Sequence, residues 1–323
     1  MRPLTIAAVL AFAMASTVSA AVLDVRELNT KQISALDRAK TVVILPGGIL
    51  EEHGPFLPAF TDGYQTDFIA ARVADAIGAR PGWTVLKFPV LPLGANPASD
   101  IGMKYSFPGS YPVRVSTLRA VYMDFATDLG DAGFKWIFAL NLHGAPTHAL
   151  AIDDACRYFS ETYGGRMVQL TGLAQVAGAV PRDLFTPEQR REGGFSVHAD
   201  ADEHSRLLFL RPDLVDAGIR SAPPVVGRNM ADLVTIAKGD GWPGYWGTPA
   251  IASAEAGRRG MQAIADAAVQ IALRVLEGAP DSALPRVADG MNDPDVRRIM
   301  DAVLAHEREN ERRQAEWLAK QRP

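Results

Sequence analysis

The order of apolar and polar positions along the chain predicts alternating strands and helices. Short apolar runs predict buried strands at 41–45, 83–90, 135–141 and 167–170. Helical spacing of apolar residues predicts helices at 66–77, at 116–129 with Ser116 as N-cap, at 148–160, at 201–210 and at 253–277. Strands separated by helices at these distances are typical of βαβ units, so the pattern predicts an α/β fold with a mainly parallel sheet.

The pattern changes character after Gly278, where prolines mark a linker. Asp293 and Pro294 then form a cap followed by proline at the first helical position. The apolar stripe that follows consists of Val296, Ile299, Met300, Val303 and Leu304. We therefore expect residues 279–323 to form a linker and a C-terminal amphipathic helix. This helix packs either on its own domain or on a neighbouring subunit.

The first residues of the chain have the features of a secretory signal peptide. Arg2 precedes an almost wholly apolar run at 4–18, and Val18-Ser19-Ala20 fits a small-residue cleavage site. A membrane anchor or a first buried helix is the alternative, but the run is shorter than the roughly 20 residues that span a bilayer. We expect residues 1–20 to be removed, leaving a domain over 21–278 in an exported, periplasmic protein with no membrane segment.

Composition and charge narrow the class of protein. The chain has 323 residues, of which 48% are hydrophobic and 22% charged, which excludes a disordered or fibrous chain. The formal net charge of −4 argues against nucleic acid as the main partner. The single cysteine, Cys156, cannot form an internal disulfide, and we interpret it as a helix packing residue.

Polar residues gather where predicted strands end, which is where parallel sheets place their ligands. Three clusters stand at 47–62, 141–144 and 198–205. Five of the six histidines lie in or beside them, namely His53, His143, His148, His198 and His204. Random placement seldom gives such a concentration. Burying so many polar groups is costly unless an ion compensates, so the concentration favours a metal site.

Each cluster also has an ordinary interpretation when it is taken alone. Glu51 and His53 would point to one side of an extended segment and suit zinc, manganese or iron, yet such pairs are common on surfaces. His143 could be a core or capping histidine. The acidic stretch 200–203 could be a helix N-terminus, where negative charge is favourable.

Several motifs in order resemble those of the creatininase family. The segment 47–62 reads Gly-Gly-Ile-Leu-Glu-Glu-His-Gly-Pro-Phe-Leu-Pro-Ala-Phe-Thr-Asp and is similar to the family signature. The turn Phe107-Pro-Gly-Ser, the motif Asn141-Leu-His-Gly, and the segments 198–205 and 247–259 resemble further family motifs. The likeness extends from about residue 24 to residue 277.

The resemblance implies a three-layer α/β/α sandwich with two divalent ions, of zinc, manganese or iron, that hydrolyses carbon–nitrogen bonds in amides, often cyclic ones. The positions that match metal ligands are Glu51, His53, Asp62, His143 and Glu203, with Asp62 as the carboxylate between both ions. His198 matches a histidine that lines the reaction centre and moves protons. Members of the family are commonly hexamers, so a homo-oligomer is expected.

Departures from the family pattern bear on the substrate. Ala145 stands where creatininase proper has a ligating glutamate, and Gly144-Ala145-Pro146 replaces the Gly-Gly-Asn of many relatives. Asp200 replaces a glycine and His204 a threonine. These changes argue against creatinine as the substrate. They leave the five matching ligands intact, because Glu203 can fill the coordination that Ala145 cannot.

The expected substrate is a small molecule whose carbonyl carbon is attacked by metal-activated water. Trp242, Tyr245 and Trp246, in a loop rich in glycine and proline, are candidates for a pocket wall, with ordinary packing as the alternative. His148 and His204 are candidates for orienting the ligands. Two other functions stay open: hydrolysis of a lactone or another non-amide carbonyl compound, and binding of a metal or solute without catalysis.

Overall fold

The computed structural model describes residues 21–171, 180–280, 284 and 293–321. Its centre is a five-stranded sheet with the order β1-β3-β2-β4-β5. The strands are β1 (Ala21–Asp24), β2 (Thr41–Gly47), β3 (Thr84–Lys87), β4 (Trp136–Asn141) and β5 (Arg166–Gln169). All four pairings are parallel. The predicted parallel α/β architecture is confirmed.

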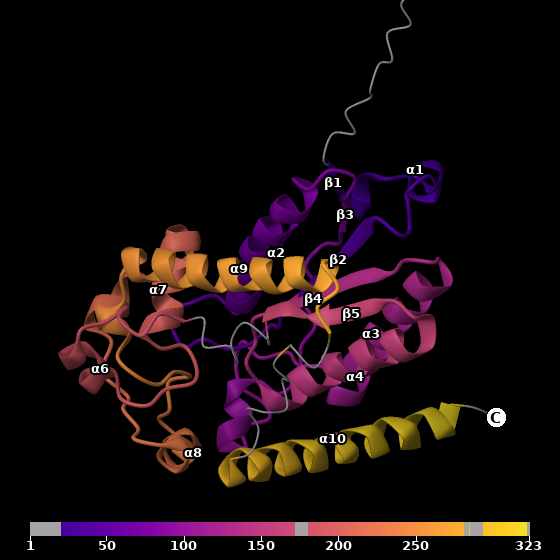
Figure 1. Ribbon diagram of the computed structural model, residues 1–323. Coiled ribbons are helices and arrows are strands. Elements are labelled where there is room, and N and C mark those ends of the chain that lie inside the picture. The colour runs from indigo at the N-terminus through magenta and orange to yellow at the C-terminus, as the bar shows by residue number, and fades with distance from the viewer. Residues whose placement is uncertain (1–20, 172–179, 281–283, 285–292, 322–323) are drawn as a thin grey trace, which may run out of the picture.

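Helices cover both faces of this sheet (Figure 1). The four large ones are α2 (Thr61–Gly78), α3 (Val115–Asp131), α4 (Pro146–Tyr163) and α9 (Ala254–Leu276). Because side chains alternate along a strand, Val42 and Ile44 of β2 pack with α2 and α9, whereas Val43 and Leu45 pack with α3 and α4. The result is the expected three-layer α/β/α sandwich.

Shorter elements connect the strands and the large helices. They are η1 (Val25–Glu27), α1 (Thr30–Ser34), η2 (Ala98–Gly102), α6 (Pro187–Gly193), α7 (Ala201–Leu210), η3 (Pro212–Leu214), η4 (Ala217–Ser221), α8 (Met230–Lys238) and η5 (Pro249–Ile251). Helix α7 packs closely on α9, where a Cβ atom on Gly257 would lie 1.8 Å from the carbonyl oxygen of Ser205. This contact holds α7 beside the sheet.

Some predicted boundaries need correction. Helix α3 begins at Val115 with Arg114 as its N-cap, so Ser116 lies inside the helix and does not cap it. The amide of Val115 instead donates to the Glu307 carboxylate at 2.9 and 3.0 Å, and this partner is too distant in sequence for a local pattern to reveal. The sequence pattern also missed β1 and α8. Cys156 is 4% exposed within α4, as its interpretation as a packing residue requires.

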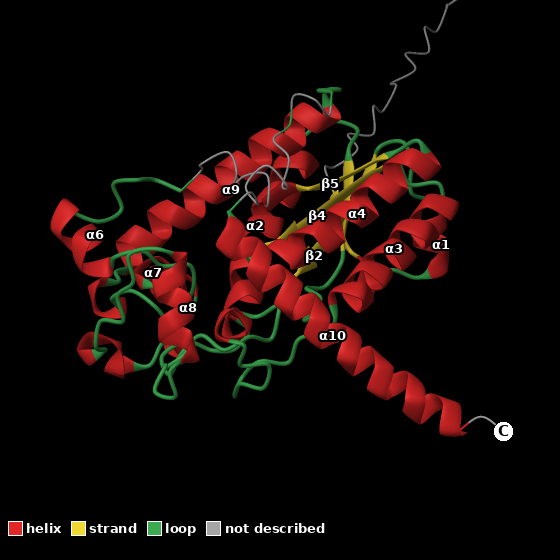
Figure 2. Ribbon diagram, turned by 90° about the horizontal axis from the view of Figure 1, so that it is seen from below, coloured by secondary structure: helices red, strands yellow, loops and turns green. Residues whose placement is uncertain are grey.

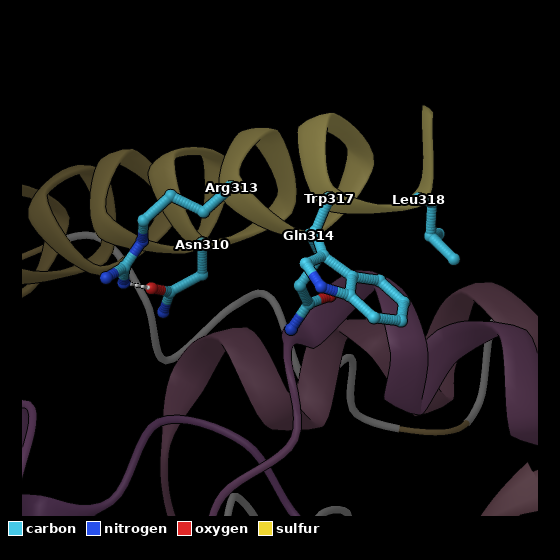
Figure 3. Close-up of a pocket in the computed structure, with 5 residues that line it drawn as sticks. All are labelled: Asn310, Arg313, Gln314, Trp317 and Leu318. Carbon is cyan, nitrogen blue, oxygen red and sulfur yellow. Dashed lines mark hydrogen bonds between the residues drawn. The ribbon is translucent and has the colours of Figure 1, made fainter. Parts of the chain in front are cut away.

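The C-terminal helix α10 (Pro294–Gln321) packs on its own chain through its first half. Val303 is 2% exposed, and the His306 ring stacks on Tyr105 with centroids 3.9 Å apart. The second half extends away from the body (Figure 2). There Trp317 is 61% exposed beside an open hollow, and the described residues that line this hollow all belong to α10 (Figure 3).

The predicted signal peptide lies outside the described residues, which begin with β1 at Ala21. In the part of the chain that the structure describes, no helix is both long and apolar enough to cross a membrane.

Candidate metal centre

The predicted ligands come from separate elements that meet at one edge of the sheet. Glu51 and His53 lie in the loop after β2, and His143 follows β4. Because β2 and β4 are neighbours and Gly47 pairs with Asn141, the two loops emerge side by side. Asp62 stands in the first turn of α2, and Glu203 in the first turn of α7.

These side chains form three groups, and within each group the potential ligand atoms all lie within 4.8 Å of one another. The groups are Glu51, Asp62 and His143; His53, Asp62 and Glu203; and Glu51, His53 and His198. Asp62, Glu51 and His53 each belong to two of them, and the two oxygens of Asp62 face different histidines. Oδ2 of Asp62 lies 3.4 Å from Nδ1 of His143, and its Oδ1 lies 3.9 Å from Nε2 of His53. Asp62 therefore has the position of a carboxylate shared between two ions.

Backbone carbonyls orient the two ligand histidines. Nδ1 of His53 donates to the carbonyl of Glu51 at 3.1 Å, which leaves Nε2 as the atom that faces the carboxylates. Nε2 of His143 donates to the carbonyls of Ala95 and Asn96, both at 3.1 Å, which leaves Nδ1 facing Glu51. A hydrogen bond from the other ring nitrogen fixes the tautomer and aims the lone pair of the free nitrogen at a metal.

His198 is oriented in the same way. Its Nε2 donates to the carbonyl of Glu52 at 2.6 Å, and its Nδ1 lies 3.7 Å from Oε1 of Glu51. This geometry suits a ligand as well as a proton carrier, an option that the sequence did not reveal. The structure thus brings His198 together with all five predicted ligands.

The donor set fits a metal ion on a direct structural test. Nε2 of His53 is buried, and among the described residues it has no hydrogen-bond partner. It lies 3.9 Å from Oδ1 of Asp62 and 3.8 Å from Oε2 of Glu203, too far for hydrogen bonds. Ligands that share an ion with bonds of about 2.0–2.2 Å stand about 3–4 Å apart. An ion between these three groups would satisfy the orphaned nitrogen.

The family-like turn at 107–110 supports the loop that carries Glu51 and His53. The Ser110 hydroxyl donates to the Glu52 carboxylate and accepts from the Glu52 amide. Gly109 has a φ of 95°, and a Cβ atom there would touch Glu52 at 3.5 Å. Glu51 is held further by the Ala98 amide, which donates to its Oε1 at 2.5 Å.

Asp200 and His204, which depart from the family pattern, both support the start of α7, where Glu203 lies. Asp200 is the N-cap of α7 and accepts from the amides of Asp202 and Glu203. It therefore fixes the helical turn that presents Glu203. His204 bonds the carbonyl of Asp200 at 2.9 Å, so it supports the same helical turn through the backbone.

His148 acts on His143 through the backbone of Ala95, which fits the predicted orienting role. Its Nδ1 accepts from the Ala95 amide at 3.2 Å, and the Ala95 carbonyl accepts from His143. Its ring also meets His143 edge-on, with centroids 4.9 Å apart. His148 thereby positions the backbone that positions His143.

Burial and neighbouring charges shift the pKa values in the cluster. Burial opposes ionisation of Glu51, but the His143 and His198 rings beside it hold its pKa below the ordinary range. Burial also opposes protonation of His143, yet Glu51 and Asp62 raise the pKa of that ring well above its usual value. Burial raises the pKa of Glu203 to about 7 and lowers that of His198 to about 4. Glu51 and Asp62 thus attract positive charge at His143, whereas burial disfavours the charged forms of Glu203 and His198.

A cavity of about 250 Å³ opens onto this cluster. Besides Glu51, Asp62, His143, His198 and Glu203, its lining consists of Asn96, Pro97, Ala98, Ile101, Gly144, Ala145, Pro146, Val197, Met230, Val296, Ile299 and Met300. The last three belong to α10. The sequence showed their stripe, but only the tertiary structure shows that it faces the metal centre.

The structure places the three predicted wall aromatics elsewhere. Trp242, Tyr245 and Trp246 are buried and do not line this cavity. The indole nitrogen of Trp242 donates to the Tyr245 carbonyl, and the Tyr245 hydroxyl donates to the Pro223 carbonyl. Trp246 lies behind His198, with ring centroids 6.4 Å apart. All three pack in the interior, which matches the packing alternative, and the buried indole nitrogen of Trp246 has no hydrogen-bond partner among the described residues.

Comparisons with known proteins agree with this geometry. Residues 26–272 match the family model "Creatininase: Creatinine amidohydrolase", which is well over half of the chain. The chain belongs to the creatininase family. It is therefore a member of a family of hydrolases, and its α10 lies beyond the matched residues.

Relatives within this family carry different names. The chain is 27% identical over 268 residues to a mycofactocin precursor peptide peptidase of Mycobacterium ulcerans, covering 80% of this chain and 94% of the relative. It is 25% identical to a 3-dehydro-scyllo-inosose hydrolase of Thermotoga maritima, covering 80% and 85%. A solved structure titled "Creatininase Mn" has 24% identity and a TM-score of 0.59, covering 80% and 99%. The last likeness supports the fold.

Proposed function

We propose that this chain is an exported, metal-dependent hydrolase that cleaves a carbon–nitrogen bond in a small cyclic amide or a related carbonyl compound. The observation that carries the proposal is the position of Asp62, whose two oxygens face separate histidine-containing groups. A buried carboxylate placed in this way is suited to lie between two ions.

The residues divide between the two ions. Glu51, Asp62 and His143 would hold one, and His53, Asp62 and Glu203 the other. When bound, two divalent ions lower the pKa of a shared water and polarise a carbonyl oxygen. The Glu52 carbonyl holds the His198 ring so that Nδ1 faces the same space. From there Nδ1 can carry a proton to the leaving nitrogen.

Matched variants test the two roles separately. We expect Asp62→Ala to lose both bound ions and hydrolysis together. We expect His198→Ala to keep its ions and to lose at least about 100-fold in rate, because a placed proton donor contributes 10²–10⁴-fold. Asp75→Ala is the control, since Asp75 is exposed on the same helix as Asp62. Metal content is measured by mass spectrometry beside the rate.

Each result has a clear meaning. An Asp62→Ala variant that keeps two ions and full activity would exclude a shared carboxylate. A His198→Ala variant that loses an ion would make His198 a ligand, as its third group allows.

The substrate class is tested with a panel of cyclic amides, lactams, formamides and lactones. We expect metal-dependent release of amine from a cyclic amide and poor turnover of creatinine, because Ala145 lacks the carboxylate of creatininase proper. Lactones belong in the panel because a relative is named as hydrolase of a non-amide compound. Metal binding without any turnover across the panel would favour a binding protein.

Export and assembly are parts of the same proposal. The apolar run at 4–18 and the small residues before Ala21 support cleavage of a leader. We expect the mature protein to begin at Ala21 and to elute as a homo-oligomer. Intact mass of protein from the periplasmic fraction and light scattering measure the two properties. An uncleaved chain in the cytoplasm or a monomer would contradict the corresponding part.

A further inference from the structure

Helix α10 contributes side chains to the cavity of the metal centre. Val296, Ile299 and Met300 follow helical spacing, so they share one face of the helix. All three are half-buried and line the cavity that opens onto Glu51 and Asp62. The family match ends at residue 272, so this wall is a feature of the chain beyond the shared domain.

Three contacts hold α10 in this position. Val303, one turn after the wall, is 2% exposed. The His306 ring stacks on Tyr105 at 3.9 Å with an interplanar angle of 5°. The Glu307 carboxylate accepts from the Val115 amide at the start of α3. Packing, stacking and a charge-assisted hydrogen bond therefore fix the register of the helix over the cavity.

Away from the ion ligands, the rest of the cavity is apolar or already hydrogen-bonded. Ile101, Val197 and Met230 face the same space as α10. The Asn96 amide oxygen accepts from Thr147 at 2.8 Å, and its nitrogen donates to Asp100 at 3.3 Å. Within the described ranges, the lining includes no lysine or arginine. A substrate carboxylate would thus have no cationic partner outside the ions.

We propose that α10 is the specificity element of this hydrolase, and that it selects neutral substrates with an apolar group of a few carbons attached to the reacting carbonyl. The proposal rests on the proposed function, because the carbonyl must be held at the metal centre. The volume of about 250 Å³ lies below the 300–1,000 Å³ typical of drug-sized ligands, which limits the group to a few carbons.

Alkyl hydroxamates probe the wall without requiring turnover. Their two oxygens bind divalent ions, and the alkyl chain extends from the carbonyl carbon. We measure the affinities of acetohydroxamate, butanohydroxamate and hexanohydroxamate for the zinc-loaded full chain by calorimetry. We expect affinity to rise about fourfold for each added methylene. Succinic monohydroxamate, which replaces the terminal methyl of butanohydroxamate by a carboxylate, should bind at least tenfold more weakly than butanohydroxamate.

Variants assign the effect to α10. Met300→Gln and Val296→Thr should each reduce the ratio of hexanohydroxamate to acetohydroxamate affinity by at least threefold. Ala305→Gln, on the exposed side of the same helix, should leave that ratio unchanged. Circular dichroism and zinc content confirm that each variant is folded and contains zinc. If Met300→Gln does not fold, Val296→Thr still tests the proposal.

The outcomes separate two kinds of failure. A chain that binds neither zinc nor acetohydroxamate would overturn the proposed function and the wall with it. A chain that binds zinc and acetohydroxamate could still show no rise in affinity with alkyl length, or could prefer succinic monohydroxamate. Either result would overturn only the role of α10 in substrate selection. Unchanged ratios in both cavity variants would likewise remove α10 from substrate selection.

Discussion

Asp100 shows how burial changes the pKa of a carboxyl group beside the metal centre. Its side chain is buried, and its Oδ2 accepts from Asn96 at 3.3 Å. Burial raises the pKa of this carboxyl to about 7, and the neighbouring Glu51 and Glu307 carboxylates add to the rise. In the unfolded chain the same carboxyl ionises near 3.8. Folding therefore binds a proton at Asp100 over the interval between these two values.

We expect Asp100→Asn to change the pH dependence of stability. The contribution of Asp100 is fully present below about pH 4 and is lost as the pH rises through about 7. The variant should therefore match the native chain at pH 4 and exceed it at pH 8, by on the order of 4 kcal/mol at most. Thermal unfolding of chelator-treated protein from pH 4 to 8 measures this. Parallel curves would contradict it, and Asp75→Asn is the exposed control.

Single residues also show why the centre could be predicted from the sequence. Glu51, His53 and His143 directly follow strands, so parallel pairing alone brings them together. Asp62 lies in the first turn of α2, which packs on β2 and β4, and Glu203 lies in the first turn of α7, which packs on α9 and α2. By contrast, the spacing of residues along the chain could not show that His198 is also placed to be a metal ligand, or that Trp242 is buried. Both properties depend on contacts between distant segments.

Among the elements, α7 and α9 depend on one glycine for their close approach. A Cβ atom on Gly257 would lie 1.8 Å from the Ser205 carbonyl oxygen, while one on Gly260 would meet Asp202 at an ordinary 3.5 Å. We expect Gly257→Ala to lower the free energy of unfolding by about 3 kcal/mol through overpacking. Gly260→Ala should raise it by about 0.5–1 kcal/mol, as alanine favours helix.

Denaturant titration of the two glycine variants decides the point. Equal midpoints would show that α7 and α9 can move apart at no cost. Because α7 carries Glu203, we also expect Gly257→Ala to weaken zinc binding more than Gly260→Ala does.

Docking of α10 gives a second test at this scale. Val303→Asp places an unpaired carboxylate at a site that is 2% exposed, which should release the helix from the body. We expect faster amide hydrogen exchange across residues 294–311, with zinc content unchanged. Ala305→Asp, at an exposed position, should leave exchange as it is. Unchanged protection in Val303→Asp would mean that other contacts suffice.

At the scale of elements, periodicity identified the strands β2 to β5 and the helices that cover them. Strand β1 escaped, since its four residues follow directly on the apolar segment of the predicted signal peptide. The start of α3 was misplaced because its cap comes from Glu307, 192 positions away. Local patterns describe local structure, and they fail where a distant segment supplies the partner.

For the whole molecule, we expect bound ions to contribute to stability. Each ion that binds only the folded chain adds about 4 kcal/mol when its free concentration is 1,000 times its dissociation constant. Treatment with a chelator should therefore lower the unfolding temperature of the native chain and leave that of Asp62→Ala unchanged. Scanning calorimetry with and without added zinc measures both. A chelator effect of equal size in the variant would place the stabilising ions elsewhere.

The sharing of Asp62 between two groups fixes the charge balance of the loaded centre. Glu51, Asp62 and Glu203 contribute three negative charges, and two divalent cations contribute four positive ones. One positive charge would then be left over among these groups. Bound ions would therefore favour loss of a proton from a neighbouring water molecule, because the anion left behind would neutralise the remaining charge.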